Sequence, residues 1–432
     1  MTYSIKDIDL KKPLIEYCRN VTNIEGDTFV GIKSELSNDK HEITINFPIG
    51  YRLPKTEEEA NQDIINLIEV LQSNINDEDK IDRVSNTHGL KMVKFPINSY
   101  FIVISDYLAR GSYYQEIEEV YVKKTTGRAN IKQTIRKITP NIQDNGFIYT
   151  DFMVNSKTYT DKEEITRISW YCIYESLSKL GWMYRLPLIE KPHFDNENRY
   201  FQRVLENKIR RVNSDKKKLL FSSMIDVLDY RDNADNPEEF YFGTNNFEYI
   251  WEKLIDKTFG IKNKQDYFPR TSWQLRYGDK DKKNFSLEPD TIMIYNDNVY
   301  VLDAKYYKYG ITGLPNHLPN SSSISKQITY AEYISENKKF KEKLNNKNIY
   351  NAFLMPYSKE NSLFKVDDKE KNYLNIGKAL SEWKSNEKIY ENIQGILVDI
   401  KDLMKNNISL PDKELMRLSA EIEKYRLGGV AK

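Results

Sequence analysis

Two short apolar runs joined by a polar turn constrain the fold of this chain more than any other feature. The runs span residues 291–295 and 299–302, and Asn296, Asp297 and Asn298 separate them. Short runs rich in β-branched and aromatic residues, on either side of turn-forming residues, are typical of a β-hairpin. A two-residue turn pairs position 295 with position 298, whereas a three-residue loop shifts the pairing by one. We favour the two-residue turn.

Two aspartates and a lysine flank this hairpin. In the favoured register Asp290 lies directly opposite Asp303, and Lys305 projects from the same face as Asp303 because side chains on a strand alternate. Two adjacent carboxylates repel each other at neutral pH unless a cation neutralises them, and hard oxygen ligands select Mg²⁺ or Mn²⁺. Such an ion polarises a phosphodiester, and Lys305 can orient the attacking water or offset transition-state charge. The hairpin therefore predicts a metal-dependent hydrolytic site for phosphodiesters.

A third acid is expected on a helix that precedes the hairpin. Residues 247–254 carry four apolar side chains at helical spacing, Phe247, Ile250, Trp251 and Leu254. Thr244 or Asn245 is the expected N-cap. Glu252 lies at the edge of the apolar face, and we prefer it to Glu248, one turn earlier, as the acid that reaches the site.

A helix is also expected after the hairpin. A loop rich in Gly, Pro and Ser at residues 310–323 leads into a helical pattern at 324–344, where Gln327 and Tyr330 share a face. Gln327 is a candidate for positioning the water or the phosphate. Each acid alone is weak evidence, because most Asp-x-Lys sequences on strands are ordinary surface. The ordered combination of helix, acids, hairpin, lysine and helix carries the prediction.

The N-terminal part of the chain combines strands with a helix. Apolar and polar residues alternate in 29–32 and 43–47, which predicts two short strands. Residues 57–75 begin with three acids and continue with apolar residues at helical spacing, and Thr56 is the expected N-cap. Residues 163–181 form a long amphipathic stretch ending at a glycine, which predicts another helix.

A chain of 432 residues is too long for one core, and we expect three regions. Residues 1–125 are expected to form a mixed α/β N-terminal domain that contacts a partner or DNA. Residues 126–235 are expected to form a mainly helical middle region with a basic segment. Residues 236–432 hold the hairpin and its flanking helices, and the boundary falls near the polar, proline-containing segment 233–237.

The densest basic cluster occupies residues 203–218. It contains seven basic side chains: Arg203, Lys208, Arg210, Arg211, Lys216, Lys217 and Lys218. Such a cluster can follow a phosphate backbone. It can equally be a solvated helix end and loop, and both interpretations stay open.

Composition excludes several classes of protein. The 65 Lys+Arg and 64 Asp+Glu give a net charge of +1, so DNA affinity must come from local patches. Cys18 and Cys172 have no Cys or His at ligand spacing, which argues against structural zinc and against a disulfide framework. The sequence has no phosphate-binding loop, so we expect no nucleotide site in this chain. Its apolar runs are too short to span a bilayer, so we expect a cytoplasmic protein without membrane contact.

The order of these elements resembles the core of the PD-(D/E)XK nuclease superfamily, in which a helix precedes a three-stranded meander with the acids, a crossover helix and another strand. Residues 245–258, 287–306, 324–345 and 349–356 follow that order. Within the superfamily the chain is similar to McrC-like nuclease subunits, including the LlaJI and BsuMI type restriction endonucleases. The similarity rests on Phe247 to Glu252, Glu288 to Asp290, Leu302 to Tyr306 and Lys326 to Tyr330.

The residue patterns predict α+β N-terminal and helical middle regions. The resemblance, which is specific over about residues 240–400, implies that they are followed by a C-terminal α/β PD-(D/E)XK nuclease domain with a mixed central sheet flanked by helices. It implies Glu252, Asp290 and Asp303 as metal ligands, Lys305 as the catalytic lysine and Gln327 as an accessory residue. The expected cofactor is Mg²⁺, with Mn²⁺ as the alternative.

The resemblance also implies an activity and partners. The substrate would be double-stranded DNA, cut as part of a bacterial restriction system directed against phage. McrC-like subunits act with an McrB-like AAA+ GTPase that recognises DNA and translocates, and the missing phosphate loop fits that division of labour. A dimer is expected as one route to double-strand cleavage.

Two other functions stay open. A stand-alone type II restriction endonuclease would read DNA bases with its own N-terminal region. A non-catalytic adaptor would keep the nuclease fold but not the site residues, and in this sequence all four of Glu252, Asp290, Asp303 and Lys305 are present. The sequence does not separate type II-like cleavage from modification-dependent cleavage.

Overall fold

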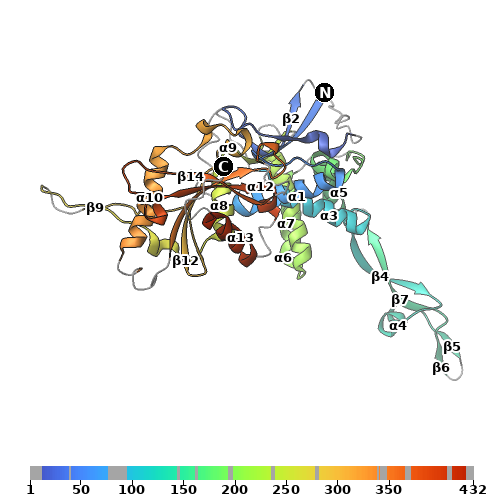
Figure 1. The fold of residues 1–432 in the computed structure, drawn as a ribbon. Coiled ribbons are helices and arrows are strands. Elements are labelled where there is room, and N and C mark those ends of the chain that lie inside the picture. The colour runs from blue at the N-terminus through green and yellow to red at the C-terminus, as the bar shows by residue number, and fades with distance from the viewer. Residues whose placement is uncertain are drawn as a thin grey trace. The chain divides into compact units, whose positions relative to one another are not determined.

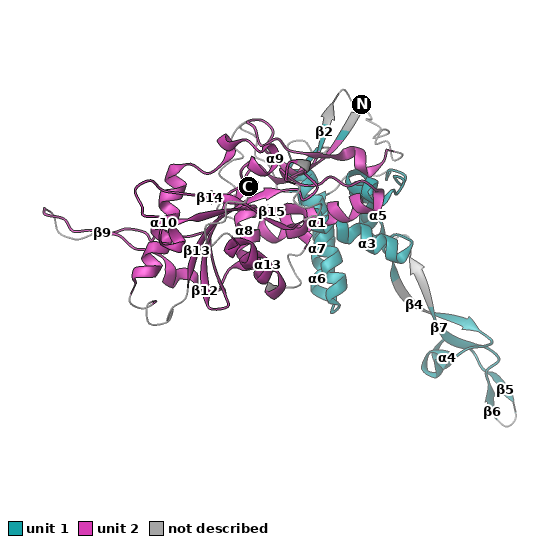
Figure 2. Cartoon of the chain, viewed as in Figure 1, with its two compact units in different colours: residues 1–11, 34–42, 89–240 teal, residues 12–33, 43–88, 241–432 magenta. Residues whose placement is uncertain are grey.

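The computed structural model forms two compact units, each built from several segments of the chain (Figures 1 and 2). It describes residues 12–37, 40–75, 95–143, 146–160, 164–192, 198–234, 239–277, 282–337, 340, 348–364, 371–405 and 411–424. Unit 1 consists of residues 1–11, 34–42 and 89–240, and unit 2 of residues 12–33, 43–88 and 241–432. The predicted three-region division stays a prediction.

The core of unit 2 is a five-stranded mixed sheet with the order β11-β12-β13-β15-β14. Its strands are β11 (Thr291–Tyr295), β12 (Asn298–Ala304), β13 (Ile349–Tyr357), β14 (Tyr373–Ala379) and β15 (Ile393–Asp399). The three central strands are parallel, and β11 and β14 pair antiparallel at the edges. Every residue of β13 is buried, as in a strand covered on both faces. The predicted mixed sheet in the C-terminal region is confirmed.

The β11–β12 hairpin has the predicted register. Tyr295 pairs with Asn298, and Thr291 pairs with Leu302. Asn296 and Asp297 both have positive φ, 46° and 67°, which matches the two-residue turn that suits the twist of paired strands. The two-residue turn is therefore confirmed, and the three-residue loop is excluded.

Helices cover both faces of this sheet: α8 (Phe247–Phe259), α10 (Ser321–Glu336), α12 (Ile400–Lys405) and α13 (Pro411–Glu423). Val301 packs in one apolar cluster with Ile334 of α10, whereas the hydroxyl of the neighbouring Tyr300 donates to Glu423 of α13. Because successive side chains on a strand point to opposite faces, α10 and α13 lie on opposite sides of β12.

Two predicted helix starts are wrong by a few residues. The N-cap of α8 is Asn246, not Thr244 or Asn245, and the Thr244 hydroxyl instead accepts the backbone N–H of Asn246. Helix α10 begins at Ser321, three residues before the predicted start, because the Asn320 side chain accepts the N–H of Ser323 and caps the helix there. The predicted end of this helix lies outside the described residues.

A second sheet has the order β1-β3-β2-β8, with β1 (Cys18–Asn20), β2 (Val30–Ser37), β3 (Lys40–Phe47) and β8 (Phe240–Thr244). It confirms the two predicted N-terminal strands. At the β2–β8 contact the backbones approach so closely that a Cβ on Gly31 would lie 2.2 Å from the Phe242 carbonyl oxygen. Only glycine fits there, and the φ of +146° at Gly31 is also one that glycine tolerates best.

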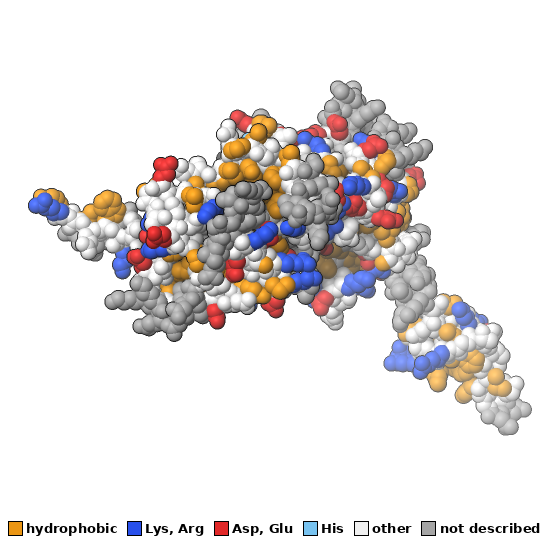
Figure 3. Space-filling view, in the orientation of Figure 1, with side chains coloured by type: hydrophobic (Ala, Val, Ile, Leu, Met, Phe, Trp, Pro, Cys, Tyr) orange, Lys and Arg blue, Asp and Glu red, His pale blue; other side chains and the backbone are white. Residues whose placement is uncertain are grey.

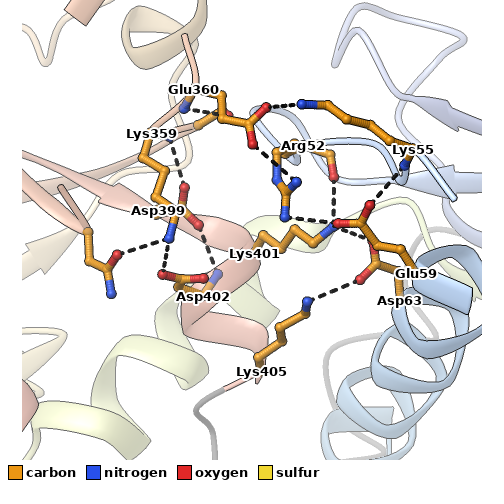
Figure 4. Close-up of polar contacts among 12 residues, drawn as sticks. Arg52, Lys55, Glu59, Asp63, Lys359, Glu360, Asp399, Lys401, Asp402 and Lys405 are labelled. Carbon is orange, nitrogen blue, oxygen red and sulfur yellow. Dashed lines mark hydrogen bonds and ion pairs between the residues drawn. The ribbon is translucent and has the colours of Figure 1, made fainter. Parts of the chain in front are cut away.

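Helix α1 (Glu57–Ile75) confirms another prediction, since the Thr56 hydroxyl accepts the N–H of Glu59 and caps its first turn. A polar network joins α1 to β15 and α12 within unit 2 (Figure 4). At its centre the Lys401 ammonium donates to Asp63 and to Glu59, the latter at 2.7 Å, and both Lys401 and Asp63 are buried. This network ties the N-terminal segment of unit 2 to the sheet.

Unit 1 contains the long helices α3 (Ile97–Arg110), α5 (Glu164–Leu180), α6 (Asn198–Arg211) and α7 (Asp215–Asn233), which pack on one another. Helix α5 confirms the helix predicted at 163–181. A helical bundle therefore makes up the later part of the predicted middle region.

The earlier part of that region differs from the helical expectation. There β4 (Glu116–Lys124) and β7 (Phe152–Thr160) form a ribbon that carries α4 (Ile131–Lys137) and the small hairpin β5 (Asn141–Gln143) and β6 (Gly146–Ile148). Residues 116–124 alternate only at Glu116 to Glu118 and then carry the β-favouring run Val120 to Val122, so the strand signal of this ribbon is weak. We call residues 116–160 the arm.

The remaining elements are short: η1 (Leu14–Tyr17), η3 (Gly181–Tyr184), η4 (Lys264–Tyr267), β9 (Ser272–Trp273), β10 (Lys282–Lys283), α9 (Tyr309–Thr312), η5 (Pro315–His317), η6 (Ser362–Phe364) and η7 (Ile389–Glu391). Within the described part of the chain, no helix is long and apolar enough to cross a membrane.

Candidate functional site

Asp290, Asp303 and Lys305 come together at one end of the β11–β12 hairpin. The Asp290 carboxylate accepts the backbone N–H of Ala304 at 2.9 Å, so it lies beside the end of β12. The Lys305 ammonium lies 2.6 Å from the Asp303 carboxylate. Continuing the observed register by one pair sets position 290 opposite position 303, and strand alternation places all three side chains on the face that α10 covers.

The carboxylates in this group repel one another. Burial raises the pKa of Asp290, and the negative charges of Asp303 and Glu252 raise it further, to about 7. The N–H of Ala304 and the ammonium of Lys305 oppose this rise but do not cancel it. The site therefore holds more negative charge than its own cations neutralise, which is the condition that favours binding of a further cation.

Lys305 is half-buried between the two aspartates. Burial alone would lower its pKa, but the charges of Asp303 and then Asp290 outweigh that effect, and the pKa of Lys305 is raised above its usual value. Its backbone N–H donates to the Leu354 carbonyl on β13 at 2.8 Å, which holds the residue against the central strand. Lys305 is therefore an ammonium at neutral pH, held in place by its backbone.

Glu252 and Glu248 occupy different surroundings on α8. The charge of Glu252 acts on Asp290, whereas the charge of Glu248 acts on the buried Tyr306. The adjacent Trp251 is fully buried, and its indole N–H donates to the Leu354 carbonyl at 3.3 Å, which fixes α8 against β13. Of the two glutamates, Glu252 is the one whose charge raises the pKa of Asp290.

The sequence predicted that three acids share a metal ion, but the described residues contain no group of three or more His, Cys, Asp or Glu side chains placed to hold one. The two aspartates meet beside Lys305, and Glu252 acts on Asp290 through charge. The donor set still fits Mg²⁺, which commonly binds through one or two carboxylates and keeps several waters. Asp290 and Asp303 are the residues that would hold it.

Gln327 supports the site from α10. Its side-chain amide donates to the Val301 carbonyl of β12 at 2.7 Å, and the residue is only 1% exposed. In this arrangement Gln327 fixes the strand that carries Asp303. Whether it also contacts water or phosphate stays a prediction.

Two further residues of α10 lie close to the aspartates, and the sequence analysis did not assign them to the site. A side-chain hydrogen bond with Tyr330 is the main reason that the pKa of Lys326 is raised, and the negative charges of Asp303 and Asp290 raise this pKa further. The Lys326 ammonium lies 5.6 Å from the centre of the Tyr330 ring. Lys326 precedes Tyr330 by four residues, so the helical spacing that put Tyr330 on one face with Gln327 also puts Lys326 beside Tyr330 and could have identified it.

The basic cluster predicted from sequence lies along α6, α7 and the turn that joins them. Its members are exposed except Lys208, which forms an ion pair with Glu116 within unit 1. The cluster is separate in sequence from the aspartate centre and belongs to the other unit. A role in DNA binding stays a prediction.

Comparison with known proteins identifies the class as restriction endonuclease. The profile of the LlaJI restriction endonuclease family matches residues 30–382 of the 432-residue chain, so the chain belongs to that family. The resemblance to LlaJI-type enzymes is therefore confirmed, and the general activity of the family is that of a DNA-cleaving hydrolase.

Among solved structures, the chain is similar to one described as a refined half-complex from a tetradecameric assembly of Thermococcus gammatolerans McrB AAA+ hexamers with bound McrC. The identity is 14% over 92% of this chain and 83% of that chain, with a TM-score of 0.35. A likeness at this level carries no argument about function. No curated protein matches the chain significantly.

Proposed function

We propose that this chain is the endonuclease subunit of a bacterial restriction system and hydrolyses phosphodiester bonds of double-stranded DNA with Mg²⁺. Membership of the LlaJI family supports the nuclease class. The observation that carries the site assignment is the convergence of Asp290, Asp303 and Lys305 on one face of a mixed sheet. We assign them to a nuclease domain of the PD-(D/E)XK type spanning residues 236–432.

Each side chain has a distinct task in this proposal. Mg²⁺, when bound, polarises the scissile phosphate and lowers the pKa of water. Asp290 and Asp303 supply its protein ligands, and Glu252 adds negative charge beside Asp290 that strengthens cation binding. Lys305 stays protonated because its pKa is raised, so it stabilises negative charge on the phosphate oxygens rather than accepting a proton. Gln327 holds β12 in register with α10.

The proposed partner is an McrB-like AAA+ GTPase. The chain carries no phosphate-binding loop and a net charge of only +1, which suits a subunit that another protein delivers to DNA. In this arrangement DNA cleavage depends on the assembled complex. A subunit that acts on cellular DNA together with a GTPase would work in the cytoplasm, and we propose that location. A dimer of the chain would provide two catalytic centres, one for each strand of the DNA.

The arm offers a surface on which such a partner could bind. It exposes four large apolar side chains at 60% or more of their area: Ile131, Ile135, Ile142 and Phe147. Clustered exposed apolar side chains of this size mark protein interaction sites. These residues belong to the predicted middle region, residues 126–235.

Cleavage of plasmid DNA by the purified chain, with Mg²⁺ and with the GTPase and GTP, tests the proposal. Lys305→Ala is expected to abolish cleavage while the circular dichroism spectrum stays unchanged, because a half-exposed lysine contributes little to packing. Lys413→Ala, at an exposed position on α13, is the matched control and should cleave as the wild type does. Cleavage by Lys305→Ala at the wild-type rate would refute the site.

The same assay separates the alternatives. Specific cleavage without the GTPase would replace the proposed complex with a stand-alone type II enzyme. Absence of cleavage with every component present would favour the non-catalytic adaptor. Methylated and unmethylated plasmids of the same sequence distinguish a modification-dependent enzyme from one that cuts unmodified sites.

A further inference from the structure

A two-stranded ribbon, which follows α8 and precedes β11 in the chain, projects from unit 2 (Figures 1 and 2). Its strands β9 and β10 pair antiparallel, with Trp273 opposite Lys282 and Ser272 opposite Lys283. Backbone bonds extend the ribbon toward its base, from Asn284 N–H to the Thr271 carbonyl and from Leu287 N–H to the Pro269 carbonyl. We call the described residues 270–277 and 282–287 the ribbon.

The ribbon exposes large apolar side chains that no core covers (Figure 3). Phe285 is 98% exposed, Tyr277 82%, Trp273 61% and Leu275 50%. The two strands pair over only two residues each, and these four large apolar side chains stay at least half exposed, so burial contributes little to the stability of the ribbon. Exposed aromatic groups on a projecting element need a function other than folding, and binding is the usual one.

The ribbon also carries positive charge. Its sequence from 270 to 287 contains five basic residues, Arg270, Arg276, Lys280, Lys282 and Lys283, and two acidic ones, Asp279 and Asp281. Among the described side chains, Arg270, Arg276 and Lys283 are all exposed, and the Arg276 guanidinium lies 5.8 Å from the Tyr277 ring centre. Cations interleaved with aromatic rings suit a partner that presents both phosphates and base surfaces.

The base of the ribbon is fixed close to the aspartate centre. Leu287 is three residues before Asp290, which is at most about 11 Å of extended chain. The Tyr330 hydroxyl donates to the Glu288 carbonyl at 3.1 Å, and the Lys264 ammonium donates to the Asp290 carbonyl at 2.6 Å. The base of the ribbon is therefore next to Asp290, and a long partner that lies along the ribbon can extend to Asp290.

We infer that the ribbon lies in a groove of the duplex DNA substrate and holds it against the Asp290–Asp303 centre, an inference that rests on the proposed nuclease function. The major groove accommodates a two-stranded β-ribbon, as it accommodates an α-helix. In this arrangement Arg276 and Lys283 contact phosphates, and Trp273, Tyr277 and Phe285 pack on sugars and base edges.

A second copy of the chain fits this surface less well than DNA does. A symmetric pair of ribbons would bring the same basic residues together, and like charges in contact oppose association. DNA offers the opposite charge along the whole ribbon.

Binding of a short fluorescent duplex DNA to the full chain in EDTA, where cleavage is blocked, tests the inference. The double variant Trp273→Ala/Tyr277→Ala is expected to bind at least about tenfold more weakly, as for loss of an aromatic anchor. Arg276→Ala/Lys283→Ala should reduce the slope of log affinity against log salt by about 1.8, since each phosphate contact contributes about 0.9. All these side chains are exposed, so the variants should keep the wild-type melting temperature.

Trp383→Ala and Lys413→Ala are the matched controls. Trp383 is 63% exposed, close to the 61% of Trp273, and belongs to the same unit but not to the ribbon. Both controls should bind DNA as the wild type does. The inference would be overturned if the ribbon variants bound DNA with wild-type affinity. It would also be overturned if the control variants lost as much DNA affinity as the ribbon variants, or if the wild-type chain showed no measurable DNA affinity.

Lys305→Ala separates this inference from the proposed function. If the ribbon inference alone fails, Lys305→Ala loses cleavage while the ribbon variants bind normally. If the proposed function alone fails, Lys305→Ala changes no activity while the ribbon variants still lose DNA affinity. Wild-type DNA affinity with loss of self-association in the ribbon variants would assign the ribbon to a second copy instead and overturn the inference.

Discussion

The Asp290 carboxylate accepts a hydrogen bond from the backbone N–H of Ala304, the residue that separates Asp303 from Lys305. This bond joins a residue just before β11 to the end of β12. The bond holds Asp290 beside Asp303 at the open end of the hairpin. The geometry of the acidic pair therefore follows from the register of one hairpin.

Asp303→Asn should remove most of the metal binding, because it deletes one of the two carboxylates that would hold Mg²⁺. In the wild type, a metal concentration one hundred times its dissociation constant should raise the free energy of unfolding by about 2.7 kcal/mol. The variant should show little of this gain in urea denaturation with and without Mg²⁺. Asp412→Asn, at an exposed position on α13, should keep the full gain. A wild-type gain in Asp303→Asn would contradict the proposed ligands.

The metal-free protein should become less stable as pH rises from 3.8 to about 7. Burial, then Asp303 and Glu252, raise the pKa of Asp290 from 3.8 to about 7, so the folded chain holds this proton more tightly than the unfolded chain does. Stability from this group is therefore complete below pH 3.8 and lost as pH rises through about 7. The slope is at most about 1.4 kcal/mol per pH unit.

Urea denaturation in EDTA across this pH range measures the effect, with Asp290→Asn as the comparison. In Asp290→Asn, the free energy of unfolding should no longer show the part of its fall with pH that comes from Asp290. Mg²⁺ should bind more tightly as pH rises toward 7, because the cation competes with the Asp290 proton. Identical pH profiles for the wild type and Asp290→Asn would show that Asp290 does not titrate in this range.

The hairpin and its acids could be predicted because the information is local. Turn residues that accept positive φ, such as Asn296 and Asp297, set the register, and strand alternation then places Asp303 and Lys305 on one face. Helix α1 was predictable for the same reason, since Thr56 caps it from the adjacent position.

The rest depends on contacts between residues distant in sequence. The bond from Gln327 to the Val301 carbonyl depends on how α10 packs against β12, and no local pattern encodes it. The absence of a three-acid cluster among the described residues has a similar origin, because the distance from Glu252 to the aspartates depends on the placement of α8. The ribbon was missed because its residues bury little apolar area, and hydrophobic periodicity depends on burial.

Gln327→Leu should lower the free energy of unfolding by about 1 kcal/mol, because it removes a buried hydrogen bond between α10 and the Val301 carbonyl of β12. Urea denaturation measures this loss. Gln62→Leu, at an exposed position on α1, should cost less than about 0.5 kcal/mol. The cleavage rate of folded Gln327→Leu, measured against Mg²⁺ concentration, then tests the accessory role. If Gln327 only supports β12, the Mg²⁺ dependence should stay as in the wild type. If Gln327 contacts the phosphate or the water, the Mg²⁺ dependence should change.

Lys401→Met should destabilise the protein by about 3 kcal/mol, because it removes the ammonium that forms the closest ion pair with the fully buried Asp63 carboxylate. Among the described residues, Lys405 then remains as an ion-pair partner at 3.5 Å (Figure 4). The double variant Lys401→Met/Asp63→Leu should recover most of that loss, since it removes both buried charges together. Lys424→Met, in an exposed pair with Glu421, should cost less than about 1 kcal/mol. Additive losses in the double variant, measured by urea denaturation, would mean that Lys401 stabilises unit 2 through contacts other than Asp63.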